Sequence, residues 1–378
     1  MIDKRLIKNF DFGILVIIIL LACFGMIGIG VAMRSPTEGN ESIYEVLGNI
    51  NLRYVKSQAL WVVIGLVILF IVASIDYNVY KDLSLYAYIL VLALLVFVSK
   101  KGNIAGNARR AISVGPINIQ PSEFAKLVII ISTAKAIEKR ESLKSIGDII
   151  PIFIQLIPPL FLIYKQPDLG TSLVLVVIVF GMLFVAGLDY KLILGMLGVG
   201  LGSIPIAWKF VFSETQKNRI RVFLNPELDP LGNAYNVVQS MTAIGSGRLY
   251  GKGLLTDNTL SQLNFLPAKH TDFIFAVTVE ALGFVGGAII IILYMLLLLK
   301  TVSVAKHSKD RYGSLIVVGV ASMMFFHIFE NIGMTMGLMP VTGIPLPFMS
   351  YGGSSMLTNM AAYGMVLSVG MRKQKIKF

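Results

Sequence analysis

The stretch Gln262–Gly283, QLNFLPAKHTDFIFAVTVEALG, determines how the rest of the chain is interpreted. It begins polar and places Asp272 where a long apolar segment begins. Over residues 273–299 the only acidic residue is Glu280, and this length suffices for a bilayer crossing at about 20 residues per span. We therefore expect Asp272 at a membrane interface. It could also be the N-cap of the helix, because aspartate accepts backbone N–H bonds there, and the two roles do not exclude each other.

The composition is typical of an integral membrane protein. Of the 378 residues, 56% are hydrophobic and only 14% are charged, and the mean hydropathy is +0.77. Apolar runs of about twenty residues recur without alternation, which favours spanning helices over a closed β-barrel. The predicted fold class is an all-α polytopic membrane protein, with residues 1–378 as a single integral-membrane domain. The single cysteine, Cys23, excludes an internal disulfide and is interpreted as a small core residue.

The apolar runs predict about ten transmembrane helices, with boundaries good to a few residues. They cover approximately 12–33, 58–75, 83–98, 121–137, 148–164, 168–187, 192–208, 273–299, 312–335 and 350–370. The only sizeable connection, at about 209–271, lies between spans seven and eight and is expected outside the cell.

Lysine and arginine in the connections predict the orientation. With the N-terminus inside, the cytoplasmic segments carry about twice as many of these residues as the short outer loops, so both termini are expected in the cytoplasm. Topology and contact with anionic lipid thus explain much of the net charge of +12, and no nucleic-acid partner is needed.

Basic residues also occur in the predicted outer loops, against the orientation rule. The loop after span three carries Lys100, Lys101, Arg109 and Arg110, with no acid before Glu123. An anionic ligand such as a phosphate or pyrophosphate would favour such a cluster. The alternative is a solvated loop with incidental lysines.

Two of the motif-like stretches at the outer face place charges at helix starts. In 120–126, QPSEFAK, Glu123 and Lys126 are three residues apart and can pair on one helix face, as a functional pair or as a structural lock. In 165–171, KQPDLGT, Asp168 either caps the next helix or faces a shared polar cavity.

The other two stretches are rich in glycine. Residues 243–253, AIGSGRLYGKG, contain Lys252, and their glycines permit close backbone approach to a ligand. Residues 343–355, GIPLPFMSYGGSS, form an uncharged hairpin that leads into the last span.

Together these stretches resemble the SEDS family (shape, elongation, division and sporulation proteins). The motifs QPSEFAK, QPDLGTS, AIGSG, GKG, NFLP..HTDFIFAV, NIGM and GIPLPFMSYGGSS occur in order over nearly the whole chain. The segment NIGMTMGLMPVTGIPLPF is more similar to the RodA elongation branch than to the FtsW division branch, with a sporulation role as a further alternative. Departures include Arg110-Ala111 in place of Arg-Trp, and Ala268 in place of a glutamate.

The resemblance implies a peptidoglycan glycosyltransferase that polymerises lipid II into glycan strands at the outer face of the bacterial cytoplasmic membrane. It also implies partners: a class B penicillin-binding protein as transpeptidase, and other membrane proteins of the elongation machinery. The aspartate of the HTDF motif, Asp272, is the implied catalytic acid.

The implied reaction joins the 4-hydroxyl of an acceptor GlcNAc to C1 of a donor MurNAc with inversion. One general base suffices, because the undecaprenyl pyrophosphate leaving group needs no proton. It needs positive charge, which Arg110 and Lys126 are expected to supply, with Glu123 orienting Lys126. No cofactor is certain, but a divalent metal (Mg²⁺ or Mn²⁺) could supply the same charge.

The remaining candidates have weaker roles. The predicted substrate-binding set is completed by Asp168, by Lys252 as a second choice for the pyrophosphate, and by Glu280. At helical rise Glu280 lies about 12 Å deeper than Asp272, so it is expected to support a buried polar network. His270 is expected at the surface, with a second base as the alternative, and His327 is expected in packing.

Two other functions remain open. A lipid II flippase would need charged residues along a path through both halves of the bilayer, whereas the charges within these spans gather toward the outer ends. A membrane scaffold for the transpeptidase would not require Asp272. The charge distribution favours an enzyme at the outer face.

Overall fold

The computed structural model describes residues 8–34, 51–105, 108–114, 117–140, 143–229, 232–256, 259–263 and 265–372. Some of the basic residues behind the orientation prediction lie in 1–7 and 373–378, outside this range. The side chain of Arg109 also lies outside what the structure describes.

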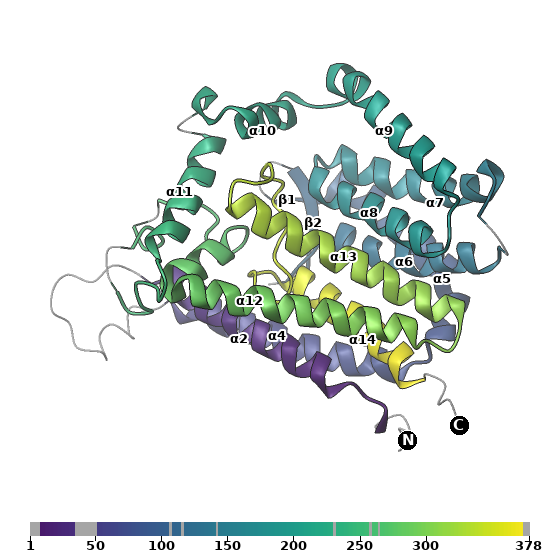
Figure 1. Ribbon diagram of the computed structural model, residues 1–378, viewed down its shortest axis with the longest axis horizontal. Coiled ribbons are helices and arrows are strands. Elements are labelled where there is room, and N and C mark those ends of the chain that lie inside the picture. The colour runs from purple at the N-terminus through teal and green to yellow at the C-terminus, as the bar shows by residue number, and fades with distance from the viewer. Residues whose placement is uncertain are drawn as a thin grey trace.

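Each of the ten predicted spans coincides with a helix in the described part of the chain, and most of these helices extend beyond the predicted limits. They are α2 (Phe12–Ala32), α4 (Leu52–Ser74), α5 (Tyr77–Lys101), α6 (Pro121–Glu138), α7 (Ile146–Lys165), α8 (Leu169–Val185), α9 (Tyr190–Phe210), α12 (Ile274–Lys306), α13 (Arg311–Thr335) and α14 (Gly353–Met371) (Figure 1).

Seven of these helices are long and apolar enough to cross a membrane: α2, α4, α5, α7, α9, α12 and α13. Helix α8 is apolar but shorter. Helices α6 and α14 bury most of their residues inside the bundle. Few of their side chains therefore face lipid, so these helices can span a membrane without being apolar on every face. The chain is an all-α multi-pass membrane protein, as predicted; ten crossings remain a prediction.

The two ends of the described chain lie side by side (Figure 1). The Asn9 side chain donates to the carbonyl of Met371 at 3.3 Å, and Lys300 pairs with Asp11 at 3.0 Å. Arg372 also pairs at 3.1 Å with Asp76, which lies in the connection between α4 and α5. This end of the bundle is called the terminus end below, and the opposite end, where α12 begins, is called the site end.

The core is formed where α2 and α13 pack on α12, α4 on α14, and α8 on α13. Cys23 lies on the exposed face of α2, so its interpretation as a core residue is wrong. Residues of α2 that pack inward, such as Ala22 and Ile29, are fully buried.

Two segments that the sequence presented as loops carry secondary structure. Between α5 and α6 lies a three-stranded antiparallel sheet of β1 (Asn103–Ala105), β2 (Ala108–Val114) and β3 (Ile117–Ile119). The connection between α9 and α12 contains α10 (Glu214–Leu224), η1 (Pro226–Leu228) and α11 (Asn233–Ser246). Figure 1 shows α10 and α11 as an arch at the site end.

Helix α12 is interrupted at Gly283, whose φ of 71° lies in the left-handed region that glycine tolerates. The segment 248–253 pairs with the interruption through its backbone. The N–H of Lys252 donates to the Glu280 carbonyl at 2.9 Å, and the N–H of Phe284 to the Arg248 carbonyl at 2.8 Å. This pairing attaches the glycine-rich stretch to α12.

Candidate active site

Asp272 lies on a tight turn immediately before α12. The N–H groups of Thr271 and Asp272 both donate to the carbonyl of Ala268 at 3.1 Å, and Ala268 has a φ of 51°. The helix therefore begins only at Ile274, and its N-cap, Phe273, makes no side-chain capping bond. The predicted capping role of Asp272 is wrong, because Phe273 takes the N-cap position of α12 and the Asp272 carboxyl group faces a cavity instead.

Three consecutive backbone carbonyls hold this turn against the rest of the site. The carbonyl of His270 accepts the N–H of Tyr351 at 2.9 Å, and that of Thr271 accepts the Ser350 hydroxyl at 2.6 Å. The carbonyl of Asp272 accepts the side-chain amide of Asn331 at 2.9 Å. The hairpin 343–355 and α13 thus fix the position of Asp272.

The cavity in front of Asp272 has a volume of about 480 Å³ and lies at the site end. Of the predicted site residues, four line it: Arg110, Glu123, Asp168 and Asp272. The rest of its wall is Trp61, Ala111, Asn118, Gln120, Thr171, Thr271, His327, Gly343, Ile344, Pro345, Tyr351, Gly352, Gly353, Ser354 and Ser355.

Burial raises the pKa of the Asp272 carboxyl above its ordinary value. The Thr271 hydroxyl and the Arg219 guanidinium act in the opposite direction and limit the rise. Gly343 leaves room beside the carboxylate: a β-carbon there would lie 3.5 Å from Asp272 Oδ2. The carboxyl group is therefore a stronger base than an exposed aspartate.

Arg110 joins the sheet to the turn between α7 and α8. Its Nε donates to the Gln166 carbonyl at 2.8 Å and its Nη2 to the Pro167 carbonyl at 2.5 Å. Asp168, on the same turn, accepts the N–H of Thr171 at 3.1 Å and the Gln120 amide at 3.4 Å while lining the cavity. The two interpretations of Asp168, helix cap and cavity residue, both describe it.

Glu123 and Lys126 form the predicted pair, with Lys126 Nζ at 2.8 Å from Glu123 Oε1. Lys126 is fully buried behind the cavity wall and does not line the cavity. His327 was expected only to pack. It is buried, but it also lines the cavity, and its Nε2 lies 3.1 Å from Lys126 Nζ.

Lys252 and Glu280 form a separate cluster away from the cavity. Their side chains pair at 2.9 Å, and Glu280 also accepts the N–H groups of Leu260 at 2.9 Å and Ser261 at 3.1 Å. Glu280 is thus in a buried polar network, as expected, and Lys252 is drawn into it. Neither residue lines the cavity with Asp272.

His270 also differs from its expected place at the surface. It is half-buried, with its ring 5.3 Å from that of Tyr54 and 5.6 Å from that of Tyr351. Burial and the neighbouring Lys269 lower its pKa. It supports the turn that carries Asp272 and does not line the cavity.

Arg219 is a charged residue near Asp272 that sequence reasoning did not assign to the site. It is half-buried on α10, and its Nη1 lies 3.5 Å from the Thr342 carbonyl. Burial and the nearby Arg110 lower its pKa, while Asp272, Asp168 and Glu330 oppose that change. The sequence showed Arg219 only as one cation of a long basic loop, because nothing local indicates where α10 folds back.

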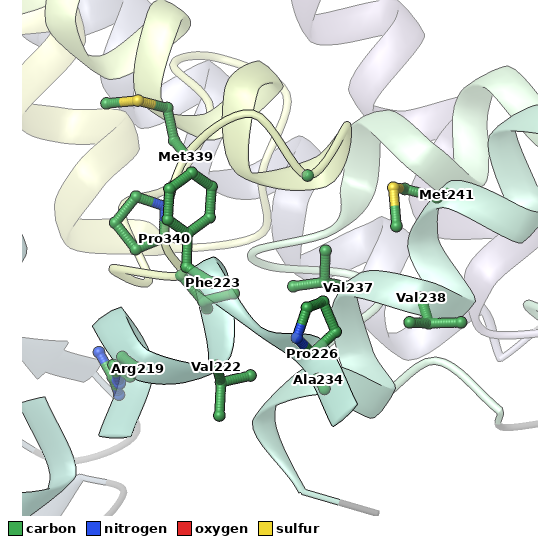
Figure 2. Close-up of a pocket in the computed structure, with 12 residues that line it drawn as sticks. Arg219, Val222, Phe223, Pro226, Ala234, Val237, Val238, Met241, Met339 and Pro340 are labelled. Atoms are coloured by element: carbon green, nitrogen blue, oxygen red, sulfur yellow. The ribbon is translucent and has the colours of Figure 1, made fainter. Parts of the chain in front are cut away.

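A small apolar cavity of about 60 Å³ lies beside Arg219 (Figure 2). Figure 2 shows side chains of α10, η1 and α11 facing Met339 and Pro340, which precede the hairpin. Its lining is otherwise Val222, Phe223, Pro226, Ala234, Val237, Val238, Met241, Gly337 and Val341. These apolar contacts hold α10, and with it Arg219, over the site end.

The residues that the structure describes do not form a metal-binding cluster. Among the described side chains, no group of three or more histidine, cysteine, aspartate or glutamate residues gathers at metal-ligand distances. Arg110 is the arginine that lines the cavity, and Arg219 lies near Asp272 on α10.

Comparison with known proteins gives a consistent result. A family profile described as "Cell cycle protein", named for FtsW, RodA and SpoVE, matches residues 14–375. The peptidoglycan glycosyltransferase MrdB of Escherichia coli (strain K12) is 39% identical over 318 residues, covering 83% of this chain and 85% of MrdB. Stage V sporulation protein E of Bacillus subtilis (strain 168) is 37% identical over 322 residues, covering 84% and 86%.

A solved structure is also similar over nearly the whole chain. It belongs to work on the coordination of polymerization and crosslinking by a peptidoglycan synthase complex. The TM-score is 0.78 at 28% identity, and the match covers 96% of this chain and 97% of the other.

Proposed function

Because the chain belongs to the FtsW, RodA and SpoVE family of cell cycle proteins, we propose that it polymerises lipid II in the cavity in front of Asp272. The chain is a peptidoglycan glycosyltransferase, the activity named for its relatives. The observation that carries the site assignment is the Asp272 carboxyl group, which has a raised pKa and faces a polar cavity at one end of a membrane bundle, on a turn whose backbone is held by Asn331.

In this mechanism Asp272 is the general base. It takes the proton from the 4-hydroxyl of the acceptor GlcNAc, and that oxygen forms a bond to C1 of the donor MurNAc. The bond from C1 to the pyrophosphate oxygen breaks, and undecaprenyl pyrophosphate leaves with both bonding electrons. Attack from the opposite face converts an α-linked donor into a β-linked product. A raised pKa strengthens the base at the working pH.

Arginine side chains stabilise the negative charge of the leaving group in this proposal. Arg110 lines the cavity, and Arg219 reaches toward Asp272 from α10. Glu123 is a substrate-binding residue at the cavity wall, with Lys126 as its buried partner. Lys252 and Glu280 hold the glycine-rich stretch on α12. A divalent metal remains a prediction, and no step of the mechanism depends on it.

The cavity faces the outside of the cell in the proposed orientation. It lies at the site end, opposite the adjacent chain ends. Lysine and arginine are about twice as numerous in the segments predicted to be cytoplasmic as in the short outer loops, which favours a cytoplasmic location for both termini. The site is then exposed to the outer leaflet of a bacterial cytoplasmic membrane, where a lipid-linked substrate can enter.

We further propose the RodA-like elongation branch and a class B penicillin-binding protein as partner. The sequence NIGMTMGLMPVTGIPLPF supports the branch. The similar solved structure, which comes from a complex that couples polymerization and crosslinking, supports a crosslinking partner. Other membrane proteins of the elongation machinery are expected to join this pair.

The function is tested with purified protein in detergent, supplied with lipid II and the partner. Wild-type protein is expected to produce glycan, and Asp272→Asn to reduce the rate by about 10²–10⁴-fold. Asp189→Asn is the matched control, because Asp189 caps α9 at its exposed N-terminus and asparagine caps equally well.

The outcomes separate the three functions. A flippase has no membrane to work across in detergent and would give no polymer with any version. A scaffold would leave output unchanged in Asp272→Asn. Polymerisation by Asp272→Asn at the parental rate would remove Asp272 from the mechanism.

A further inference from the structure

His327 connects three elements of the cavity wall. It lies on α13, its Nε2 is 3.1 Å from Lys126 Nζ on α6, and its Nδ1 is 3.2 Å from the carbonyl of Pro345 in the hairpin. Both Glu123 and His327 line the cavity, while Lys126 is enclosed behind them.

The partners of His327 determine its tautomer. The carbonyl of Pro345 can only accept a hydrogen bond, so Nδ1 carries the proton and donates it. Nε2 is then unprotonated and accepts a hydrogen bond from Lys126, whose ammonium group has only donors. In this arrangement a neutral imidazole joins the Pro345 carbonyl to Lys126, and Lys126 in turn donates to Glu123.

We propose that His327 is a positioning residue for glycosyl transfer. It holds the Lys126 ammonium group against Glu123 and so fixes the carboxylate of Glu123 at the cavity wall. This role rests on the proposed glycosyltransferase function but does not depend on Asp272 as the base.

The state of the Glu123 carboxylate shows why positioning matters. Its Oε1 accepts from Lys126, whereas its buried Oε2 has no hydrogen-bond partner among the described residues. A buried carboxyl oxygen without a partner, on a residue that lines the cavity, can accept a hydrogen bond from a hydroxyl or amide N–H of a sugar substrate. Without Nε2 of His327, the buried Lys126 ammonium group keeps only Glu123 as a side-chain acceptor. The Lys126 side chain can then shift, and the orientation of Glu123 Oε2 is no longer fixed.

Two amide substitutions separate the two hydrogen bonds of His327. His327→Gln places an oxygen near the position of Nε2 and can still accept from Lys126. His327→Asn places an N–H donor near the position of Nδ1 and can still reach the Pro345 carbonyl. The proposal predicts that Gln retains most of the polymerisation rate, whereas Asn lowers kcat/KM by about 10- to 100-fold.

Nitrogen-15 NMR of histidine-labelled protein gives a readout that does not depend on activity. The chain has three histidines, so His270→Gln combined with His307→Gln leaves the resonances of His327 alone. The expected spectrum is that of the Nδ1–H tautomer. Lys126→Met should move the Nε2 resonance toward that of a nitrogen with no donor, and leave Nδ1 nearly unchanged.

Either of two results would overturn the proposal: equal rates for the Gln and Asn variants, or an Nε2 resonance that does not respond to Lys126→Met. A wild-type protein that makes no glycan would instead contradict the proposed function. The NMR result would then still report whether His327 holds Lys126.

Discussion

The side-chain amide of Asn331 donates to the backbone carbonyl of Asp272 at 2.9 Å and to that of Ile344 at 2.8 Å. One buried side chain on α13 therefore ties the turn before α12 to the hairpin that closes the cavity. Because a displaced base loses rate steeply, this contact is expected to matter for catalysis.

Replacing Asn331 tests that contact. Asn331→Ala is expected to lower kcat about 10-fold or more and to leave KM nearly unchanged, because Asp272 is displaced while the substrate contacts remain. The matched control is Asn78→Ala, an exposed asparagine at the terminus end, which should leave kcat unchanged. Parental kcat in a folded Asn331→Ala protein would show that the turn holds its position without this bond.

The pH dependence of the reaction should report Asp272. A base works in its ionised form, and burial raises the pKa of this carboxyl, so activity should fall with decreasing pH at a higher pH than for an ordinary aspartate near 4. The Arg219 guanidinium lowers that pKa, so Arg219→Leu should move the acidic limb to higher pH. The profile of kcat/KM against pH measures both, and an unmoved limb in Arg219→Leu would contradict the interaction.

Arg110 should contribute positive charge to the cavity and hydrogen bonds that hold the turn between α7 and α8. Arg110→Ala is expected to reduce kcat/KM by the equivalent of about 1–3 kcal/mol, through loss of a charge-assisted contact with the substrate. Arg110→Lys should reduce kcat/KM less than Arg110→Ala, because lysine keeps the positive charge. Some loss is still expected, because a lysine ammonium group cannot bind the Gln166 and Pro167 carbonyls with two planar N–H donors. Lys101→Ala, an exposed lysine at the end of α5, is the control. Equal activity of all three variants would make Arg110 dispensable.

Gly283 should be required for stability. Alanine there is strained at a φ of 71°, and its β-carbon would collide with the backbone of Leu249 and Gly251. Gly283→Ala is therefore expected to lower the thermal unfolding midpoint in detergent and to release the segment 248–253 to protease. Gly198→Ala, in a helix with open space around that residue, should not do so. An unchanged midpoint in Gly283→Ala would mean that α12 tolerates a continuous helix.

Membrane orientation can be measured directly. In a Cys23→Ser background, which removes the exposed native thiol, Tyr250→Cys should react with an impermeant thiol reagent in intact cells. Lys306→Cys, at the terminus end of α12, should react only after lysis. The reverse pattern would place the cavity inside the cell and remove the proposed mechanism.

The sequence by itself determined the spanning helices and the local charge pair. A run of about twenty apolar residues has to satisfy its backbone as a helix in lipid, whatever its neighbours are. Glu123 and Lys126 meet because they are three residues apart on one helix. The motif order indicated the family, which the relatives confirm.

Only the tertiary structure decided which charges share a cavity. Arg219 on α10 lies near Asp272, and His327 on α13 contacts Lys126 on α6, although these helices are distant in sequence. Lys252 instead pairs with Glu280, because the segment 248–253 is hydrogen-bonded to α12. Cys23 faces outward because α2 packs another side on the bundle. These outcomes depend on how the helices pack and on where α12 is interrupted, and the hydropathy of the chain predicts neither.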